Sequence, residues 1–128
     1  MEEQLRIGRL WKEGITIMSE IIILNSEYMG QGNDDLGKTL IGAFLRKLWA
    51  GDKKPSAIIL YNSAAKLIAT GSETLDVMDG LYSAGVDILA CGTCVEFYDL
   101  KEQIRTGRIS NMEEICTMLM EASKVITI

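Results

Sequence analysis

The chain has 128 residues, of which 48% are hydrophobic and 24% charged, and its formal net charge is −5. This length and composition fit one globular domain and exclude a disordered chain. No run of basic residues is available to contact a phosphate backbone, so nucleic acid is not an expected partner. The apolar runs, such as Ile21 to Leu24, are far too short to span a membrane, so no membrane contact is expected.

Cysteine usage and the start of the chain bear on the compartment. The N-terminal stretch MEEQLRIGRLWKE is acidic and lacks the features of a secretory signal peptide. Three cysteines without an export signal favour a reducing compartment, where closely spaced thiols are catalytic or metal-binding. We therefore expect a cytoplasmic protein. Histidine is absent, which removes the usual general base and a common metal ligand.

The first half of the chain predicts two buried strands separated by a helix. Residues 21–24 are apolar and mostly β-branched, which is typical of a strand buried on both faces. Apolar residues at helical spacing predict a helix over 34–49, capped by Asn33 or Asp34. A turn over 51–55 ends this helix, and a second strand is expected over 57–61. Residues 1–19 fit the pattern poorly, and we interpret them as an N-terminal extension or linker remnant with a short helix around Leu5, Leu10 and Trp11.

The second half predicts further helices and two more strands. One helical turn over 64–69 precedes a helix over 72–84, with Ser72 as its cap and Gly85 after its end. A third strand over 86–90 leads into Cys91. A helix is expected from Thr93 or Cys94, with Phe97, Leu100 and Ile104 on its buried face. A further helix over 112–122 is capped by Ser110 or Asn111, with Glu113 as capping-box partner. A last strand is expected over 124–128.

Apolar strands that alternate with helices are typical of the α/β class. We predict one three-layer domain over 20–128, with a mainly parallel sheet of about four or five strands and helices on both faces. In such sheets the functional sites lie at the carboxyl ends of the strands.

The segment Cys91-Gly92-Thr93-Cys94 carries the clearest chemical signal, because it follows a strand and precedes a helix. Backbone N–H groups at a helix start stabilise a thiolate, and a second nearby thiol can attack a persulfide or mixed disulfide. We interpret Cys91 as the nucleophile and Cys94 as the resolving thiol. The alternative is that both are small buried hydrophobic residues, as free cysteines often are.

Other residues are candidates for binding the substrate. Asn25 and Asn62 each follow a strand on the same side of the sheet, where they either donate to an anion or cap the next segment. The glycine-bearing loop over 26–33, which includes Gly32, is placed to close over the cysteines. Gly92 and Thr93 complete the predicted binding set, since they form the turn between the two thiols.

Two other chemistries, a zinc site and nucleotide hydrolysis, are not predicted. Three cysteines without histidine are too few for a structural zinc site, and we expect neither a metal nor a cofactor. Cys116 lies within the last predicted helix and is expected to pack in the hydrophobic core. Residues 32–39 match the phosphate-loop pattern G-x-x-x-x-G-K-[ST], but they do not follow their strand directly, and Asp34 and Asp35 would repel phosphates.

Four stretches resemble a known family: GNDDLGKTL, ILYNSAAKL, GVDILACGTCVEFYDLK and GRISNMEEICTMLMEASKVITI. They are similar to the DsrE/DsrF-like domain of the sulfurtransferase-like selenium metabolism proteins (YedF-type). The resemblance implies a parallel α/β sheet, assembly into trimers or larger rings, and a persulfide carried by Cys91, with Cys94 beside it. Family members commonly have an N-terminal sulfur-carrier domain, which residues 1–19 cannot form, and Ala64 stands where a glycine is expected.

The resulting hypothesis is a sulfur or selenium carrier with transferase-like chemistry on the CGTC turn. Its expected partners are persulfide donor and acceptor proteins, together with further copies of the same chain. Two alternatives stay open: a non-catalytic oligomeric binding or assembly module, and a dithiol-disulfide oxidoreductase.

Overall fold

The computed structural model describes residues 19–128, and within them five parallel strands form one sheet. The strand order is β4-β3-β2-β1-β5, and all four neighbouring pairs are parallel. The strands are β1 (Glu20–Leu24), β2 (Ala57–Leu60), β3 (Asp87–Cys91), β4 (Arg108–Ser110) and β5 (Lys124–Thr127). The predicted α/β class is therefore confirmed. The short helix expected around Leu5, Leu10 and Trp11 lies outside the described residues.

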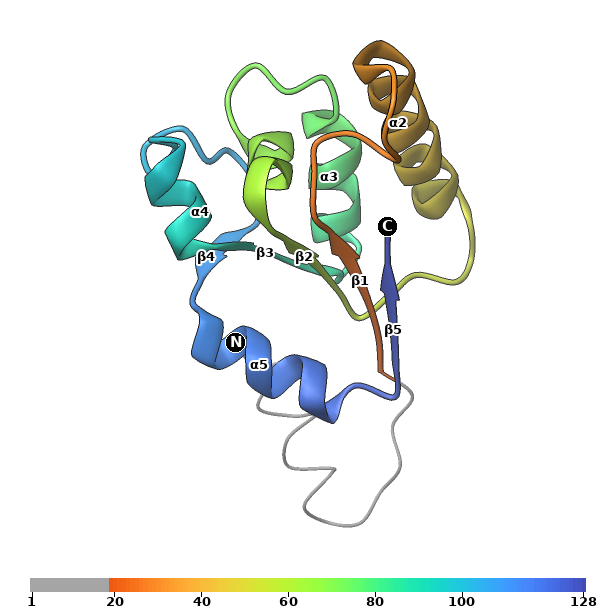
Figure 1. The fold of residues 1–128 in the computed structure, drawn as a ribbon. Helices are drawn as coiled ribbons and strands as arrows, with labels where there is room; N and C mark the ends of the chain where they lie inside the picture. Colours follow the sequence, from red (N-terminus) through yellow and green to blue (C-terminus); the bar gives the residue numbers. More distant parts are fainter. Residues whose placement is uncertain (1–18) are drawn as a thin grey trace.

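Helices cover both faces of the sheet, as expected (Figure 1). One face carries α2, α3, α4 and a 3₁₀ helix, η1, whereas α5 lies on the other face (Figure 1). Their bounds are α2 (Asp34–Ala50), η1 (Asn62–Ile68), α3 (Leu75–Ser83), α4 (Gly92–Phe97) and α5 (Met112–Glu121). No helix within residues 19–128 is both long and apolar enough to cross a membrane.

The apolar strands explain the two cores. Successive side chains of a strand point to opposite faces, so a strand that is apolar throughout is buried twice. Ile22, Ile58 and Ile88 belong to the larger cluster, under the helices of the first face. Ile21, Ile59 and Leu89 belong to the smaller one, under α5. The central strands are therefore sealed on both sides, and polar chemistry is confined to the strand ends.

The region after the CGTC turn differs from the prediction. The helix has only six residues and ends in a Schellman motif: Asp99 has a left-handed φ of 56°, Leu100 N–H donates to Val95 O, and Asp99 N–H donates to Glu96 O. Because the helix stops there, Phe97 is left 81% exposed instead of buried. The short strand β4 was not predicted.

The helix caps agree with the prediction in two cases of three. Asn33 accepts from Leu36 N–H at the start of α2, and Asn111 accepts from Glu114 N–H at the start of α5. The expectation that Ser72 caps α3 is wrong, because that helix begins only at Leu75 with no side-chain cap. Glu113 was expected as the capping-box partner in α5. Because Asn111 is the cap, the N–H that binds its side chain belongs to Glu114 instead.

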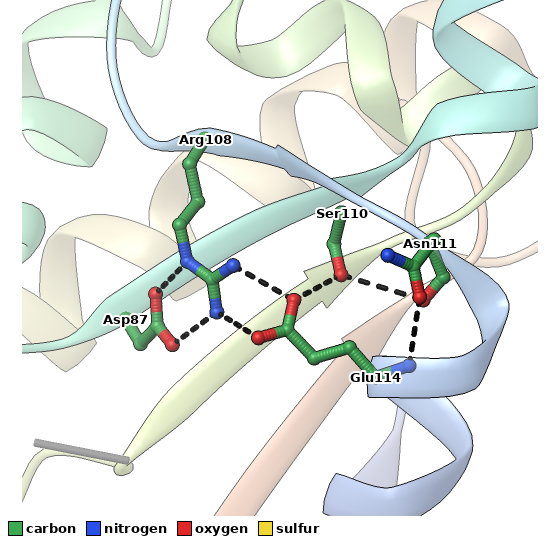
Figure 2. A network of polar contacts seen from close by, with 5 residues as sticks. All are labelled: Asp87, Arg108, Ser110, Asn111 and Glu114. Atoms are coloured by element: carbon green, nitrogen blue, oxygen red, sulfur yellow. Dashed lines mark hydrogen bonds and ion pairs between the residues drawn. The ribbon is translucent and has the colours of Figure 1, made fainter. Parts of the chain in front are cut away.

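A partly buried ion-pair network at the β4 edge of the sheet holds α5 against the sheet (Figure 2). The Arg108 guanidinium donates to both carboxylate oxygens of Asp87, at 2.9 and 2.8 Å, and to both oxygens of Glu114, at 2.7 and 3.0 Å. The hydroxyl of Ser110 also donates to Glu114. Hydrogen bonding to Arg108 lowers the pKa of Glu114, and the bond to Asp87 is the main cause that raises the pKa of Arg108. The network joins the start of β3, the strand β4 and the first turn of α5.

We expect Glu114→Gln to lower the free energy of unfolding by about 1–3 kcal/mol at pH 7, since hydrogen bonds to charged groups contribute that much. Because the folded-state pKa of Glu114 is lowered, its contribution is complete above the unfolded-state pKa of about 4.3 and is lost as pH falls through the folded value. Urea denaturation should therefore show a difference from wild type that shrinks below about pH 4. Glu113→Gln, at the exposed neighbour, is the control and should cost less. Equal losses in both variants would contradict the assignment.

Candidate functional site

The CGTC turn lies at the carboxyl end of β3, as predicted. Cys91 is the last residue of β3 and the N-cap residue of α4, and Cys94 lies in the first turn of α4. Both are free thiols, and Cys91 is near enough to raise the pKa of Cys94. The structure therefore brings the two predicted thiols together.

Gly92 is required by the close approach of β4 to this turn. A Cβ atom at position 92 would lie 2.7 Å from the carbonyl oxygen of Ser110. The neighbouring Thr93 is exposed. The tight packing against β4 explains why residue 92 is a glycine without reference to a substrate. Substrate binding by Gly92 and Thr93 stays a prediction.

The two thiols differ in exposure, in the opposite sense to the expectation. Cys91 is 3% exposed and belongs to the apolar cluster under α5, with Ile59 and Leu89. Cys94 is partly exposed and packs against both apolar clusters, where they meet at the end of the sheet. The expectation that Cys91 is presented to partners is wrong, because the final side chain of β3 still points into the core. Cys94 is the accessible member of the pair.

Asn62 reaches the site through its backbone. Its N–H group lies 3.0 Å from Cys94 Sγ and donates to it, and its φ of 50° is left-handed. Its side-chain Oδ1 accepts from the hydroxyl of Tyr98 at 2.6 Å. Asn62 therefore contacts the thiol pair through its backbone, and its predicted role in substrate binding stays a prediction.

Burial is the main cause that raises the pKa of Cys94. The Asn62 N–H acts in the opposite direction because it stabilises the thiolate, and Cys91 raises the pKa further. Cys94 is thus mainly a thiol at neutral pH, and its nucleophilic thiolate fraction grows as the pH rises.

Tyr61 is a site residue that the sequence reasoning missed. It follows β2, packs against the apolar cluster that contains Cys91, and has a raised pKa. Burial is the main cause, followed by electrostatic interaction with Cys91, Cys116 and Cys94. The phenol therefore stays protonated beside the thiols. Its position at the carboxyl end of a strand, like that of Cys91, was the available signal.

The loop after β1 is fastened to neighbouring helices. Glu27 N–H donates to Ser63 Oγ at 3.0 Å, and the carboxylate of Glu27 lies 3.5 Å from Lys66 Nζ. Met29 N–H donates to the carbonyl of Gly37. Asn25 is exposed at the end of β1, and Gly32 is exposed in the loop with a φ of 138°. These contacts hold the loop on η1 and α2, and substrate binding by Asn25 and Gly32 stays a prediction.

The segment that matches the phosphate-loop pattern is used to build α2. The N–H of Gly37 donates to Asn33 O within the first helical turn, and Lys38 lies 3.9 Å from Glu73. Lys38 and Thr39 line a cavity of about 450 Å³ between α2 and the segment 66–74. Among residues 19–128, no three cysteine or carboxylate side chains are grouped so that they could hold a metal ion.

Comparison with known proteins supports the fold alone. No family model and no curated protein matches the chain. Three solved structures each cover 88% of this chain with all of theirs. They are the ychN protein from E. coli (18% identity, TM-score 0.62), the protein of unknown function MTH1491 from Methanobacterium thermoautotrophicum (14%, 0.65) and the conserved protein of unknown function BT1422 from Bacteroides thetaiotaomicron (21%, 0.59). The chain has the fold of these YchN-type proteins.

The close approach at Gly92 makes a stability prediction. We expect Gly92→Ala to lower the free energy of unfolding by about 1–3 kcal/mol, because the added methyl group must displace the Ser110 backbone. Gly42→Ala, in α2 with open space around its Cβ position, should instead stabilise by about 0.5–1 kcal/mol. Thermal or urea denaturation of both variants measures the difference. A neutral Gly92→Ala variant would contradict the tight turn.

The exposure of the thiols predicts an order of reaction with iodoacetamide. In the native protein Cys94 should be alkylated, and its rate should keep rising through about pH 8.5, the usual thiol pKa. Cys91 should react only after unfolding, because it is buried. Peptide mass spectrometry reports each site. Cys116 is the internal reference, because it is exposed on α5 and the expectation that it packs in the core is wrong. Alkylation of Cys91 as fast as Cys94 in folded protein would contradict the assignment.

Proposed function

We propose that the protein carries sulfane sulfur, or selenium, on the CGTC pair, with Cys94 as the accepting thiol and Cys91 as the resolving thiol. The observation that carries this proposal is a pair of neighbouring, interacting thiols of unequal exposure at the carboxyl end of a parallel strand. The accessible thiol, Cys94, accepts a hydrogen bond from a backbone N–H, and its neighbour Cys91 is buried. The order of the two cysteines is thus reversed from the one that sequence position favours.

The first step transfers one sulfur atom. The Cys94 thiolate attacks the terminal sulfur of a donor persulfide, R–S–SH, so that a new S–S bond forms on Cys94 as the donor S–S bond breaks. The donor leaves as a thiol, R–SH, after taking up the proton, and Cys94 carries a persulfide. No net oxidation occurs, because one S–S bond is exchanged for another and the sulfane sulfur moves from the donor to Cys94.

The second step has two outcomes, depending on the attacking thiol. A thiolate of an acceptor protein that attacks the terminal sulfur takes it away and regenerates the Cys94 thiol. Attack by the Cys91 thiolate on the inner sulfur of Cys94 instead releases HS⁻ and leaves a Cys91–Cys94 disulfide. The two thiols are then oxidised as the sulfane sulfur is reduced to sulfide, and an external thiol reductant must restore the pair.

The remaining parts of the proposal concern partners and setting. Donor and acceptor are separate proteins, since this chain shows only one pair of adjacent thiols among residues 19–128. We propose a cytoplasmic setting, where thiols stay reduced, and assembly of several copies of the chain.

Mass spectrometry after incubation with a cysteine desulfurase and cysteine tests the carrier function. We expect an adduct of ~32 Da, one sulfur atom, on Cys94. The adduct should be absent in Cys94→Ser and should accumulate in Cys91→Ser, where nothing resolves it. Cys116→Ser is the matched control and should behave as wild type. Absence of the adduct in Cys91→Ser, where nothing resolves it, or its persistence in Cys94→Ser, would overturn the proposal.

The burial of Cys91 supports a second candidate, a binding or assembly module whose cysteines serve for packing. This function requires that Cys94, too, is inert toward persulfide donors. The Cys91→Ser variant separates the two functions, because trapped sulfur on Cys94 occurs only in a carrier.

A further inference from the structure

Asn62 is held in a conformation that favours its contact with the thiol. It is one of two non-glycine residues of the described chain with a positive φ, at 50°, and asparagine is among the few residues that tolerate this region. The conformation turns the chain sharply between β2 and η1 and aims the Asn62 N–H at Cys94 Sγ. A preference for the ordinary right-handed or extended region opposes this geometry, so something must stabilise it.

Tyr98 supplies that second contact. Its hydroxyl donates to Asn62 Oδ1 at 2.6 Å, while its own N–H donates to the carbonyl of Cys94 at 3.1 Å. Cys94 and Tyr98 are therefore one helical turn apart, and Asn62 binds to both. The result is a closed set of contacts, which we call the Asn62–Tyr98 clamp: N–H to sulfur, amide oxygen to phenol, and one turn of α4 between them.

The ring of Tyr98 is itself fixed. Lys66 Nζ lies 4.6 Å from the ring centroid, a favourable cation–π position. The ring of Phe97 meets it edge-on, with centroids 5.0 Å apart and an interplanar angle of 84°. Glu27 pairs with Lys66 at 3.5 Å, so the loop after β1 supports the same arrangement.

We propose that Tyr98 is a positioning residue, which holds Asn62 in its left-handed conformation and so keeps the Asn62 N–H on the sulfur of Cys94. The inference deepens the proposed function, on which its biological meaning rests, because it names the group that sets how readily Cys94 becomes the nucleophile. Tyr98 acts through Asn62 and does not contact the sulfur that is transferred.

Other ionisable groups face this thiol and must be distinguished from the clamp. Cys91 from β3 and Tyr61 from the end of β2 interact electrostatically with Cys94. Farther out, Cys116 of α5 interacts with Tyr61, and Lys66 of η1 stands over Tyr98 with Glu27 as its partner. The substitutions below leave all five in place. A change in the titration of Cys94 is therefore attributable to the hydrogen bond from Asn62.

The test is the pH profile of Cys94 alkylation by iodoacetamide, followed by peptide mass spectrometry. The midpoint is read, rather than the rate at one pH, because thiolate nucleophilicity itself rises with pKa. We expect Tyr98→Phe and Asn62→Ala to raise the midpoint by about 0.5–1 unit, as expected when a thiolate loses one hydrogen bond. This corresponds to roughly threefold to tenfold less thiolate at neutral pH.

Two further variants make the test specific. Asn62→Gly keeps the backbone N–H and adopts positive φ without strain, so its midpoint should stay nearer to wild type than that of Asn62→Ala. Tyr82→Phe removes a hydroxyl from an exposed tyrosine of α3 and should change nothing. A merely structural role for Tyr98 would lower stability without moving the midpoint.

The outcomes separate this inference from the carrier function. Wild-type midpoints in both Tyr98→Phe and Asn62→Ala would overturn the clamp even if the ~32 Da persulfide adduct forms on Cys94. A wild-type midpoint in Tyr98→Phe beside a raised one in Asn62→Ala would also overturn it, because Tyr98 would then not be what holds Asn62. Shifted midpoints without any persulfide would leave the clamp standing and remove the proposed function.

Discussion

The register between β2 and β3 is the constraint on which the candidate site depends. Leu60 pairs with Ala90, so the residues that follow β2 lie beside the last residue of β3. Tyr61 and Asn62 are thereby brought to the two thiols, although about thirty positions separate them in the chain. A shift of one residue would turn each side chain to the opposite face and move Asn62 away from Cys94.

The same register explains why the thiols differ. β3 is buried on both faces, and its final residue, Cys91, still points into the cluster under α5. Three residues later the chain has turned into α4, and Cys94 lies where the two apolar clusters meet the surface. Burial raises the pKa of this thiol while one backbone N–H lowers it. The balance gives a thiol that is mainly protonated at neutral pH and yet partly exposed at the strand ends.

Four of the strands were predictable from the sequence because each is a short β-branched or aliphatic run. The caps Asn33 and Asn111 were predictable because an asparagine side chain accepts a backbone N–H of the first helical turn. β4 was not, since its three residues, Arg-Ile-Ser, contain one apolar side chain and are ordered by the Arg108 ion pairs. The early end of α4 depends on the left-handed Asp99, which leaves no mark in the hydrophobic pattern. The location of the thiol pair was predictable from its place after a strand. The exposure of each thiol was not, because it depends on which face the last residue of β3 points to.

A crystal structure of the protein after treatment with inorganic polysulfide would test the central claim most directly. The account predicts additional electron density for one sulfur atom on Cys94 Sγ or, where Cys91 has resolved it, a Cys91–Cys94 disulfide, with the Asn62 N–H still beside residue 94. Density on Cys91 instead, or an unmodified pair under conditions that modify Cys116, would contradict it.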